Sequence, residues 1–141
     1  MKTAIVYWSS TGNTKAMAET IAEGARAAGA EVDLLTAAEF DTARAGDYGT
    51  LAFGCPAMGA EELEDAEFAP MFEAVKPLLR GKRIALFGSY GWGDGKWMRN
   101  WEEDCVSAGC VFAADSVICN ESPDDEAQDA CRALGKVLAE G

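Results

Sequence analysis

The feature that most constrains this chain is the alternation of short apolar runs with helical patterns along its whole length. Four runs are almost continuously apolar and cover residues 4–8, 51–55, 84–88 and 111–114, while a weaker run covers 32–35. Continuous rather than alternating apolar runs are typical of strands buried on both faces of a parallel sheet. The sequence therefore predicts a parallel sheet in which residues 32–35 form a strand near one edge.

Helical patterns lie between these runs. Residues 13–28 place Met17, Ile21 and Ala25 at a spacing of four, and Gly29 follows where a helix would end. Further helices are expected over 66–79, 96–108 and 124–138, with a short one over 37–44. Repeated strand–helix alternation implies right-handed crossovers and a three-layer α/β sandwich. Because no linker or repeat interrupts this pattern, residues 1–141 are expected to form a single domain.

The charge of the chain limits its possible partners. It carries 24 acidic and 12 basic residues, a net charge of −12, which argues against a nucleic-acid binder because such proteins neutralise phosphates with Lys and Arg. The acidity either serves solubility alone or favours partners that present basic faces. No apolar run approaches the roughly 20 residues that cross a bilayer, and the first residues are not typical of a signal peptide. We expect a cytoplasmic protein without membrane contact.

Cysteine usage and the lack of histidine argue against several kinds of chemistry. The five cysteines are an odd number without a CxxC pair, and the sequence contains no histidine. Because the ligand spacing of a zinc or iron–sulfur site is missing, no metal is expected. A Ser or Cys nucleophile would lack its usual general base. The sequence favours free, mostly buried thiols in a reducing compartment.

Ligands of open α/β sheets bind at the carboxyl ends of the strands, so the residues after each run matter most. The first such loop is rich in hydroxyls, contains one glycine and leads into the first helix; it consists of Ser9, Ser10, Thr11, Gly12, Asn13 and Thr14. A helix start offers unpaired N–H groups and a partial positive charge, so it can bind a phosphate without a cationic side chain. The alternative is an ordinary capped helix start.

Two further loops follow the next buried strands. One contains Pro56, Ala57, Met58, Gly59, Ala60 and Glu61, and the other contains Ser89, Tyr90, Gly91, Trp92 and Gly93. Trp92 stands between two glycines that offer no core around it, so it is placed to stack on a flat ring. The second loop, taken alone, is more typical of a hydrophobic plug over the core. Together the three loops predict a clamp for a planar, phosphorylated cofactor.

Residues 5–14, 54–59 and 85–95 closely resemble the corresponding segments of flavodoxins, in particular the short-chain flavodoxins of anaerobic bacteria. The resemblance implies a flavodoxin-like three-layer sandwich with a five-stranded parallel sheet of order 2-1-3-4-5. It also implies non-covalently bound FMN and a low-potential one-electron carrier, not an enzyme, that shuttles electrons between redox enzymes through the semiquinone/hydroquinone couple. The chain is too short for the long-chain subgroup, whose final strand is interrupted by an inserted loop.

The same resemblance assigns roles by position. Residues 9–14 would wrap the FMN phosphate, while Met58 and Trp92 would cover the two faces of the isoalloxazine ring. The peptide after Gly59 would turn over on reduction so that its carbonyl accepts a hydrogen bond from the flavin N5–H. Glu61 would bond the N3 edge of the ring.

Other positions match the family less fully. The backbone of residues 89–93 would lie along the pyrimidine end of the ring, and Asn120, just past the fifth strand, would also contact the cofactor. Ser10 stands where close relatives have Gly, and Ala60 stands where some relatives have Asp or Ser beside the turning glycine. These two substitutions are the departures from the family pattern.

Acidic residues near the second loop suggest how partners would dock. Glu61, Glu62, Glu64 and Asp65 would form an acidic collar around the exposed edge of the flavin. Basic faces of oxidoreductases and flavodoxin reductases would recognise this collar, and added salt would weaken the encounter. A merely solvated acidic loop is the alternative. We expect a monomer.

Three other functions fit the same architecture. An FMN-dependent quinone or azo reductase would need hydride access to the ring, which Met58 and Trp92 would block. A response-regulator-like signalling domain would need a phospho-accepting Asp where this chain has Gly54, Cys55 and Pro56. An interaction module without a cofactor would leave the exposed Trp92 unexplained.

Overall fold

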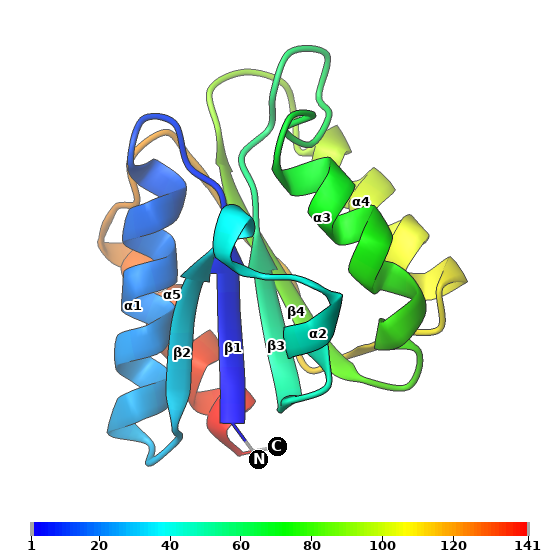
Figure 1. The fold of residues 1–141 in the computed structure, drawn as a ribbon. Helices are drawn as coiled ribbons and strands as arrows, with labels where there is room; N and C mark the ends of the chain where they lie inside the picture. The colour runs from blue at the N-terminus through cyan, green and yellow to red at the C-terminus, as the bar shows by residue number, and fades with distance from the viewer. Residues whose placement is uncertain (1, 141) are drawn as a thin grey trace.

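The structure is a computed structural model that describes residues 2–140. Its strands are all parallel and lie in the order β2-β1-β3-β4-β5, with β6 also paired to β4. The strands are β1 (Lys2–Tyr7), β2 (Val32–Thr36), β3 (Tyr48–Gly54), β4 (Arg83–Tyr90), β5 (Val111–Phe112) and β6 (Val117–Asn120). The predicted strand order 2-1-3-4-5 and the α/β class are confirmed (Figure 1).

The fifth position of the sheet differs from the prediction, because two short segments occupy it. β5 pairs with Arg83 and Ile84, and β6 pairs with the far end of the same strand, from Phe87 to Tyr90. The strand predicted over 111–114 therefore extends past the end of β5, and β6 was not predicted. An edge strand is covered on one side only, and Ile118 of β6 is 39% exposed. β6 was missed because its apolar run, residues 117–119, is only three residues long.

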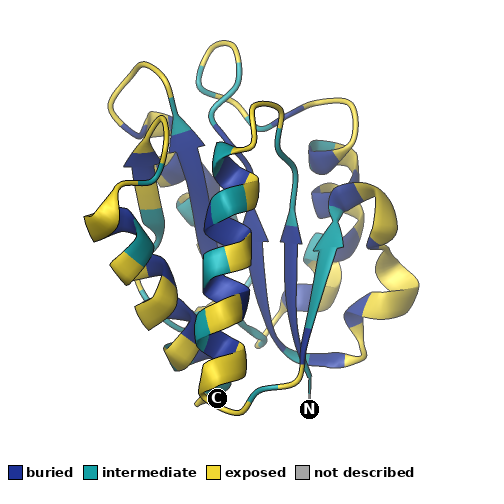
Figure 2. Ribbon diagram, turned by 90° about the vertical axis from the view of Figure 1, so that its left-hand side faces the viewer, coloured by how far each residue is buried: buried dark blue, intermediate teal, exposed yellow. Residues whose placement is uncertain are grey.

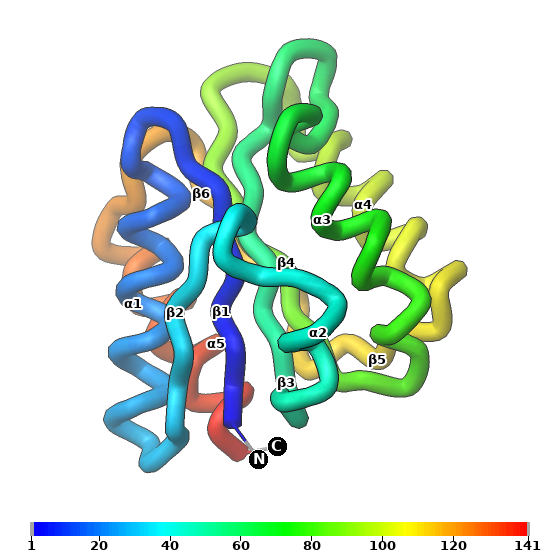
Figure 3. Tube along the Cα trace, in the orientation of Figure 1, coloured from blue at the N-terminus to red at the C-terminus, as the bar shows by residue number. Residues whose placement is uncertain are grey.

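Helices cover both faces of the sheet, as predicted (Figures 1 and 3). One face carries α1 (Asn13–Ala27) and α5 (Asp125–Ala139), and the other carries α3 (Phe68–Val75) and α4 (Lys96–Ser107). The predicted helix 66–79 becomes α3 followed by the 3₁₀ helix η2 (Lys76–Leu79), which contains Pro77. The predicted short helix 37–44 divides into η1 (Ala37–Glu39) and α2 (Thr42–Ala45).

The two cores differ in composition. Between the sheet and α1/α5 lie small and aliphatic side chains such as Ile5, Met17 and Ile21. Between the sheet and α3/α4 the core is aromatic, and the rings of Phe53 and Phe72 meet edge to face at 5.2 Å. The strands themselves are buried between these layers, whereas the loops at the ends of the sheet are largely exposed (Figure 2). Parallel strands thus bring the loops after β1, β3, β4 and β6 to one edge.

Candidate functional site

A cavity of about 470 Å³ lies at the carboxyl edge of the sheet, where these four loops meet. This volume is within the range of roughly 300–1,000 Å³ that small-molecule sites occupy. The predicted residues that line it are Ser10, Thr11, Asn13, Pro56, Ala57, Met58, Ser89, Tyr90 and Gly91. The other predicted residues belong to the same loops or border them but do not line this cavity: Ser9, Gly12, Thr14, Gly59, Ala60, Glu61, Trp92, Gly93 and Asn120.

The first loop leaves the start of α1 open. Gly12 takes the N-cap position with a φ of +99°, and no side chain caps the helix. The first intrahelical bond runs from the Ala16 N–H to the Gly12 carbonyl at 2.9 Å, so the N–H groups before it have no intrahelical partner. The alternative of an ordinary capped helix start is therefore wrong. Ser10 and Thr11 are exposed beside these N–H groups, an arrangement suited to an anion.

Thr14 has a different environment from the other hydroxyl residues of this loop. It is buried, its Oγ1 lies 3.0 Å from the Oγ of Ser89, and the Ser89 N–H donates to the same Oγ1 at 3.3 Å. These bonds join the first loop to β4. Thr14 thus positions the loop, whereas Ser10 and Thr11 are accessible to a ligand.

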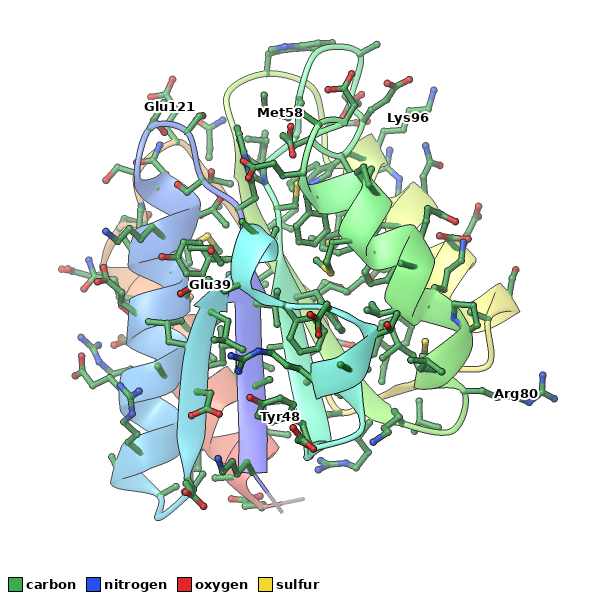
Figure 4. All side chains as sticks on the ribbon, in the orientation of Figure 1. Glu39, Tyr48, Met58, Arg80, Lys96 and Glu121 are labelled. Atoms are coloured by element: carbon green, nitrogen blue, oxygen red, sulfur yellow. The ribbon has the colours of Figure 1, made fainter. Side chains whose placement is uncertain are left out.

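The second loop is a tight turn. Met58 and Glu62 exchange two backbone hydrogen bonds of 2.8 and 2.9 Å, which leaves a three-residue turn between them. Gly59 and Glu61 are left-handed, with φ of +48° and +57°, and Gly59 and Ala60 are exposed. The Ala57 N–H donates to the Ser89 carbonyl at 3.0 Å and anchors this loop to β4. Figure 4 places Met58 along the upper edge, between Glu121 and Lys96.

Glu61 joins the second loop to the third. Its Oε1 accepts a hydrogen bond from the Lys96 backbone N–H at 3.0 Å, at the first residue of α4. A carboxylate is favoured there by the helix dipole. A Cβ on Gly93 would lie 2.7 Å from the Glu61 carboxylate and would displace it, and the φ of +85° at this position favours glycine. The role of Glu61 at the N3 edge of a flavin stays a prediction.

Behind the second loop, Glu64 is buried and does not belong to an exposed collar, contrary to the sequence interpretation. Its carboxylate accepts hydrogen bonds from the N–H groups of Ala66, Glu67 and Phe68 at 2.7–2.8 Å. Burial by itself raises the pKa of Glu64, but these three bonds outweigh it and hold the pKa below its ordinary value. Glu64 is therefore ionised, and its carboxylate stabilises the start of α3 through these hydrogen bonds.

The neighbouring Cys55 is also structural. Its thiol sulfur accepts a hydrogen bond from the Glu64 N–H at 3.3 Å, and its carbonyl accepts one from Trp97 Nε1 at 3.1 Å. Burial raises the pKa of the Cys55 thiol to about 12. A thiol with this pKa is protonated at neutral pH and is no nucleophile.

The third loop presents Trp92 to solvent. Trp92 is 63% exposed, whereas Trp97 and Trp101 on the following helix are buried in the aromatic core. Burying so large a ring against a ligand would remove apolar surface from water. Trp97 and Trp101 are therefore packing residues, and the stacking role of Trp92 stays a prediction.

The loop after β6 supplies two lining residues that sequence reasoning missed. Asn120 is the last residue of β6, not a residue beyond the strand, and its Nδ2 donates to the Tyr90 carbonyl at 3.2 Å. Glu121 and Ser122 follow it and line the cavity. Their position at the carboxyl end of a strand could have identified them as lining residues. It was not recognised because β6 itself was not predicted.

Comparisons with known proteins agree with this geometry. The family model described as "Flavodoxin" matches residues 5–135. A flavodoxin of Clostridium beijerinckii is 45% identical over 96% of this chain and 97% of its own, and one of Megasphaera elsdenii is 42% identical over 96% of both. The chain belongs to the flavodoxin family. The solution structure of two-electron reduced Megasphaera elsdenii flavodoxin superposes with a TM-score of 0.91 at 41% identity and covers 99% of both chains.

Membership of this family confirms the cofactor and the kind of function. The chain is a small FMN-binding electron-transfer protein and not an enzyme. The residues at the edge of the sheet fit FMN, since they combine an open helix start, a cavity and an exposed aromatic ring. Its length agrees with the short-chain type.

Proposed function

We propose that residues 1–141 act as one domain that binds FMN at the carboxyl edge of the sheet and carries single electrons at low potential between redox enzymes. The observation that carries this assignment is the uncapped start of α1 beside the cavity. Bound FMN supplies the one-electron chemistry. The protein supplies the binding, the orientation and the electrostatic environment.

The phosphate end of FMN is assigned to the first loop. The N–H groups at the start of α1 and the exposed hydroxyls of Ser10 and Thr11 would bind the phosphate, with Ser9, Gly12 and Asn13 shaping the loop. The Ser9 Oγ accepts from the Gly12 N–H at 3.1 Å and so preorganises the turn. The helix dipole stabilises the negative charge, so no cationic side chain is needed.

The ring end of FMN is assigned to the other loops. Met58 and Trp92 would lie against the two faces of the ring, and Glu61 would accept from its N3 edge. The Gly59 carbonyl is the proposed acceptor for the flavin N5–H. The space around Gly59 supports this role, since a Cβ built there would have nothing within 4 Å, so that the peptide has room to turn.

Low potential follows from the charge of the protein. Reduction adds negative charge beside a phosphate in a chain of net charge −12. Each kcal/mol of added repulsion lowers a one-electron potential by about 43 mV, from the relation between free energy and potential. The surrounding acids therefore favour a strongly reducing carrier.

The partners are proposed to be oxidoreductases and flavodoxin reductases with basic docking faces. Support comes from the net charge and from the exposed Glu62 and Asp65, which line a surface hollow together with Met58 and Gly59 of the second loop. Within residues 2–140, no helix is both long enough and apolar enough to span a bilayer. We propose that the chain acts as a monomer in the cytoplasm, and that added salt slows its encounters with partners.

Absorbance spectroscopy during stepwise reduction tests the function. The purified protein is expected to be yellow, or to become so after uptake of added FMN, and to accept electrons in two separate one-electron steps. It should not be bleached by NAD(P)H alone, because that would indicate a reductase. A colourless protein that fails to take up FMN would overturn the assignment.

A further inference from the structure

The C-terminal end of α4 brings two cysteines together. The Cys110 N–H donates to the Cys105 carbonyl at 3.1 Å, and the Gly109 N–H donates to the Val106 carbonyl at 3.0 Å. Gly109 is left-handed, with a φ of +86°. These bonds form a Schellman motif, in which the side chains at the two ends of the motif lie on the same side and frequently contact each other. In this chain both of those side chains are thiols.

The geometry of this pair is compatible with a covalent bond. The hydrogen bond between the two backbones limits the separation of the Cα atoms of Cys105 and Cys110 to about 7 Å, from standard bond lengths. Disulfides span Cα separations of roughly 4.4–6.8 Å. Each thiol is among the groups that shift the pKa of the other, as close neighbours do. Cys105 is buried, whereas Cys110 is accessible in part.

We propose that Cys105 and Cys110 form a redox-active thiol pair that a low-molecular-weight disulfide converts to an intramolecular disulfide. The partly accessible Cys110 thiolate attacks one sulfur of the small disulfide, which forms a mixed disulfide and releases one thiol. The Cys105 thiolate then attacks the Cys110 sulfur and releases the second thiol. The pair is oxidised by two electrons, the small disulfide is reduced, and the two protons of the cysteines end on the released thiols.

The other cysteines do not combine such a motif with a partly accessible thiol, although Cys119 lies near enough to Cys131 to shift its pKa. Cys55, Cys119 and Cys131 are buried, and the thiol of Cys119 faces the Met17 sulfur at 3.5 Å. No other two cysteines flank a motif of this kind in residues 2–140.

Burial controls the rate of the exchange. It raises the pKa of both thiols of the pair, so the exchange is slow near neutral pH and accelerates in alkaline buffer. The charged groups that face the pair are Asp104 and Lys76, which form an ion pair at 3.1 Å and act on the thiols in opposite directions.

The pair lies far from the candidate FMN site. α4 begins next to the Trp92 loop and extends away from it, so Cys105 lies about 14 Å along the helix from its first residue, and Cys110 lies beyond the far end of the helix. β5 follows Cys110 at the opposite end of the molecule in Figure 3. Oxidation is therefore expected to leave the flavin spectrum unchanged, which separates this proposal from the function above.

Oxidised glutathione at mildly alkaline pH tests the proposal on the FMN-loaded protein. Differential alkylation, before and after reduction, identifies the oxidised cysteines by mass spectrometry. The expected product has lost two hydrogens, has Cys105 and Cys110 as its only oxidised residues, and returns to the starting mass with dithiothreitol.

Two variants sharpen the result. Cys105→Ser is expected to retain a glutathione adduct on Cys110, because the resolving thiol is gone, whereas Cys131→Ser should form the disulfide as the natural chain does. A persistent adduct on Cys110 in the natural chain, oxidation of a different pair, or no reaction in alkaline buffer would overturn the proposal. Far-UV circular dichroism of the same samples reports that the protein is folded.

Discussion

The first loop and the two ring loops reach the same edge of the sheet with different chemistry. The first loop offers backbone N–H groups and small hydroxyls, and no side chain closes the helix start. The second and third loops offer large or charged side chains, namely Met58, Glu61 and Trp92, and Glu61 joins them through the Lys96 N–H. The first loop is suited to a fixed anion, and the other two to a flat ring whose charge changes.

This difference teaches that affinity and redox potential can be adjusted separately. Interactions with the phosphate are the same in every oxidation state of the flavin, so they contribute to binding without favouring one state. Interactions with the ring change as the ring gains electrons, so they shift the potential. Substitutions in the first loop that leave its charge unchanged should therefore change affinity alone, whereas substitutions in the ring loops should change potential as well.

The largest effect is expected from Thr11→Asp in the first loop. A carboxylate beside the phosphate adds repulsion and removes a hydroxyl donor, which together correspond to at least a 100-fold loss of FMN affinity. Affinity for riboflavin, which has no phosphate, should stay within about two-fold. Fluorescence titration of the apoprotein with both flavins measures the difference.

Thr11→Asn is the matched control, since it keeps the size of Asp without its charge. It should lose at most about ten-fold in FMN affinity, the equivalent of one hydrogen bond. Equal losses for FMN and riboflavin in Thr11→Asp would mean that the first loop does not bind the phosphate.

Trp92→Ala should have the next largest effect, and it should not discriminate between the two flavins. Stacking of an aromatic side chain on a base-sized ring is worth roughly 1–3 kcal/mol, so the affinities for FMN and riboflavin should both fall about 5- to 150-fold. Trp92→Phe should restore most of the loss. If Trp92→Ala binds both flavins normally, then the exposed ring does not stack on the flavin.

A smaller effect, on stability rather than binding, is expected from Glu64→Gln. Gln cannot accept all the hydrogen bonds that the carboxylate accepts at the start of α3, so the free energy of unfolding should fall by about 1–2 kcal/mol at pH 7. Urea titration measures this free energy of unfolding. The control Glu62→Gln, at an exposed position in the same loop, should change the free energy of unfolding by less than about 0.5 kcal/mol.

The effect of Glu64 should also depend on pH. Its pKa is lower in the folded protein than the ordinary value of 4.5. Its contribution is therefore complete above that ordinary value and is lost as the pH falls through the lowered pKa. The difference in stability between the natural chain and Glu64→Gln should shrink on acidification below about pH 4.5. A difference that persists at pH 2 would show that Glu64 acts by packing, not charge.

Much of the site could be predicted because it depends on local sequence. The first loop follows directly from a buried strand and a helix start, and the glycines around Trp92 remove any packing reason for that ring. These features require only neighbouring residues. The strand order, by contrast, came from the resemblance to a family, because neighbouring residues do not determine which strands pair.

What sequence reasoning missed depends on tertiary context. In the sequence, Glu64 is one of several acidic residues in the same loop, so it was predicted to be exposed. Only the folded chain places its carboxylate next to three backbone N–H groups. β6 contains a run of only three apolar residues, which is too short to stand out as a strand, and the lining residues Glu121 and Ser122 were missed with it. Cys105 and Cys110 lack the familiar CxxC spacing, and a Schellman motif brings them together.

The smallest effect is expected from Glu61→Gln, and it tests the ring loops most directly. Gln keeps an acceptor for the Lys96 N–H but removes the negative charge. The potential for adding the second electron should therefore rise by about 20–40 mV, the equivalent of roughly 0.5–1 kcal/mol, with little change in FMN affinity. Spectroelectrochemical titration measures this potential. Glu62→Gln removes an exposed charge one residue away and should shift it by less than half as much, because exposed charges are screened. Equal shifts in both variants would mean that overall charge, and not the position of Glu61, sets the potential.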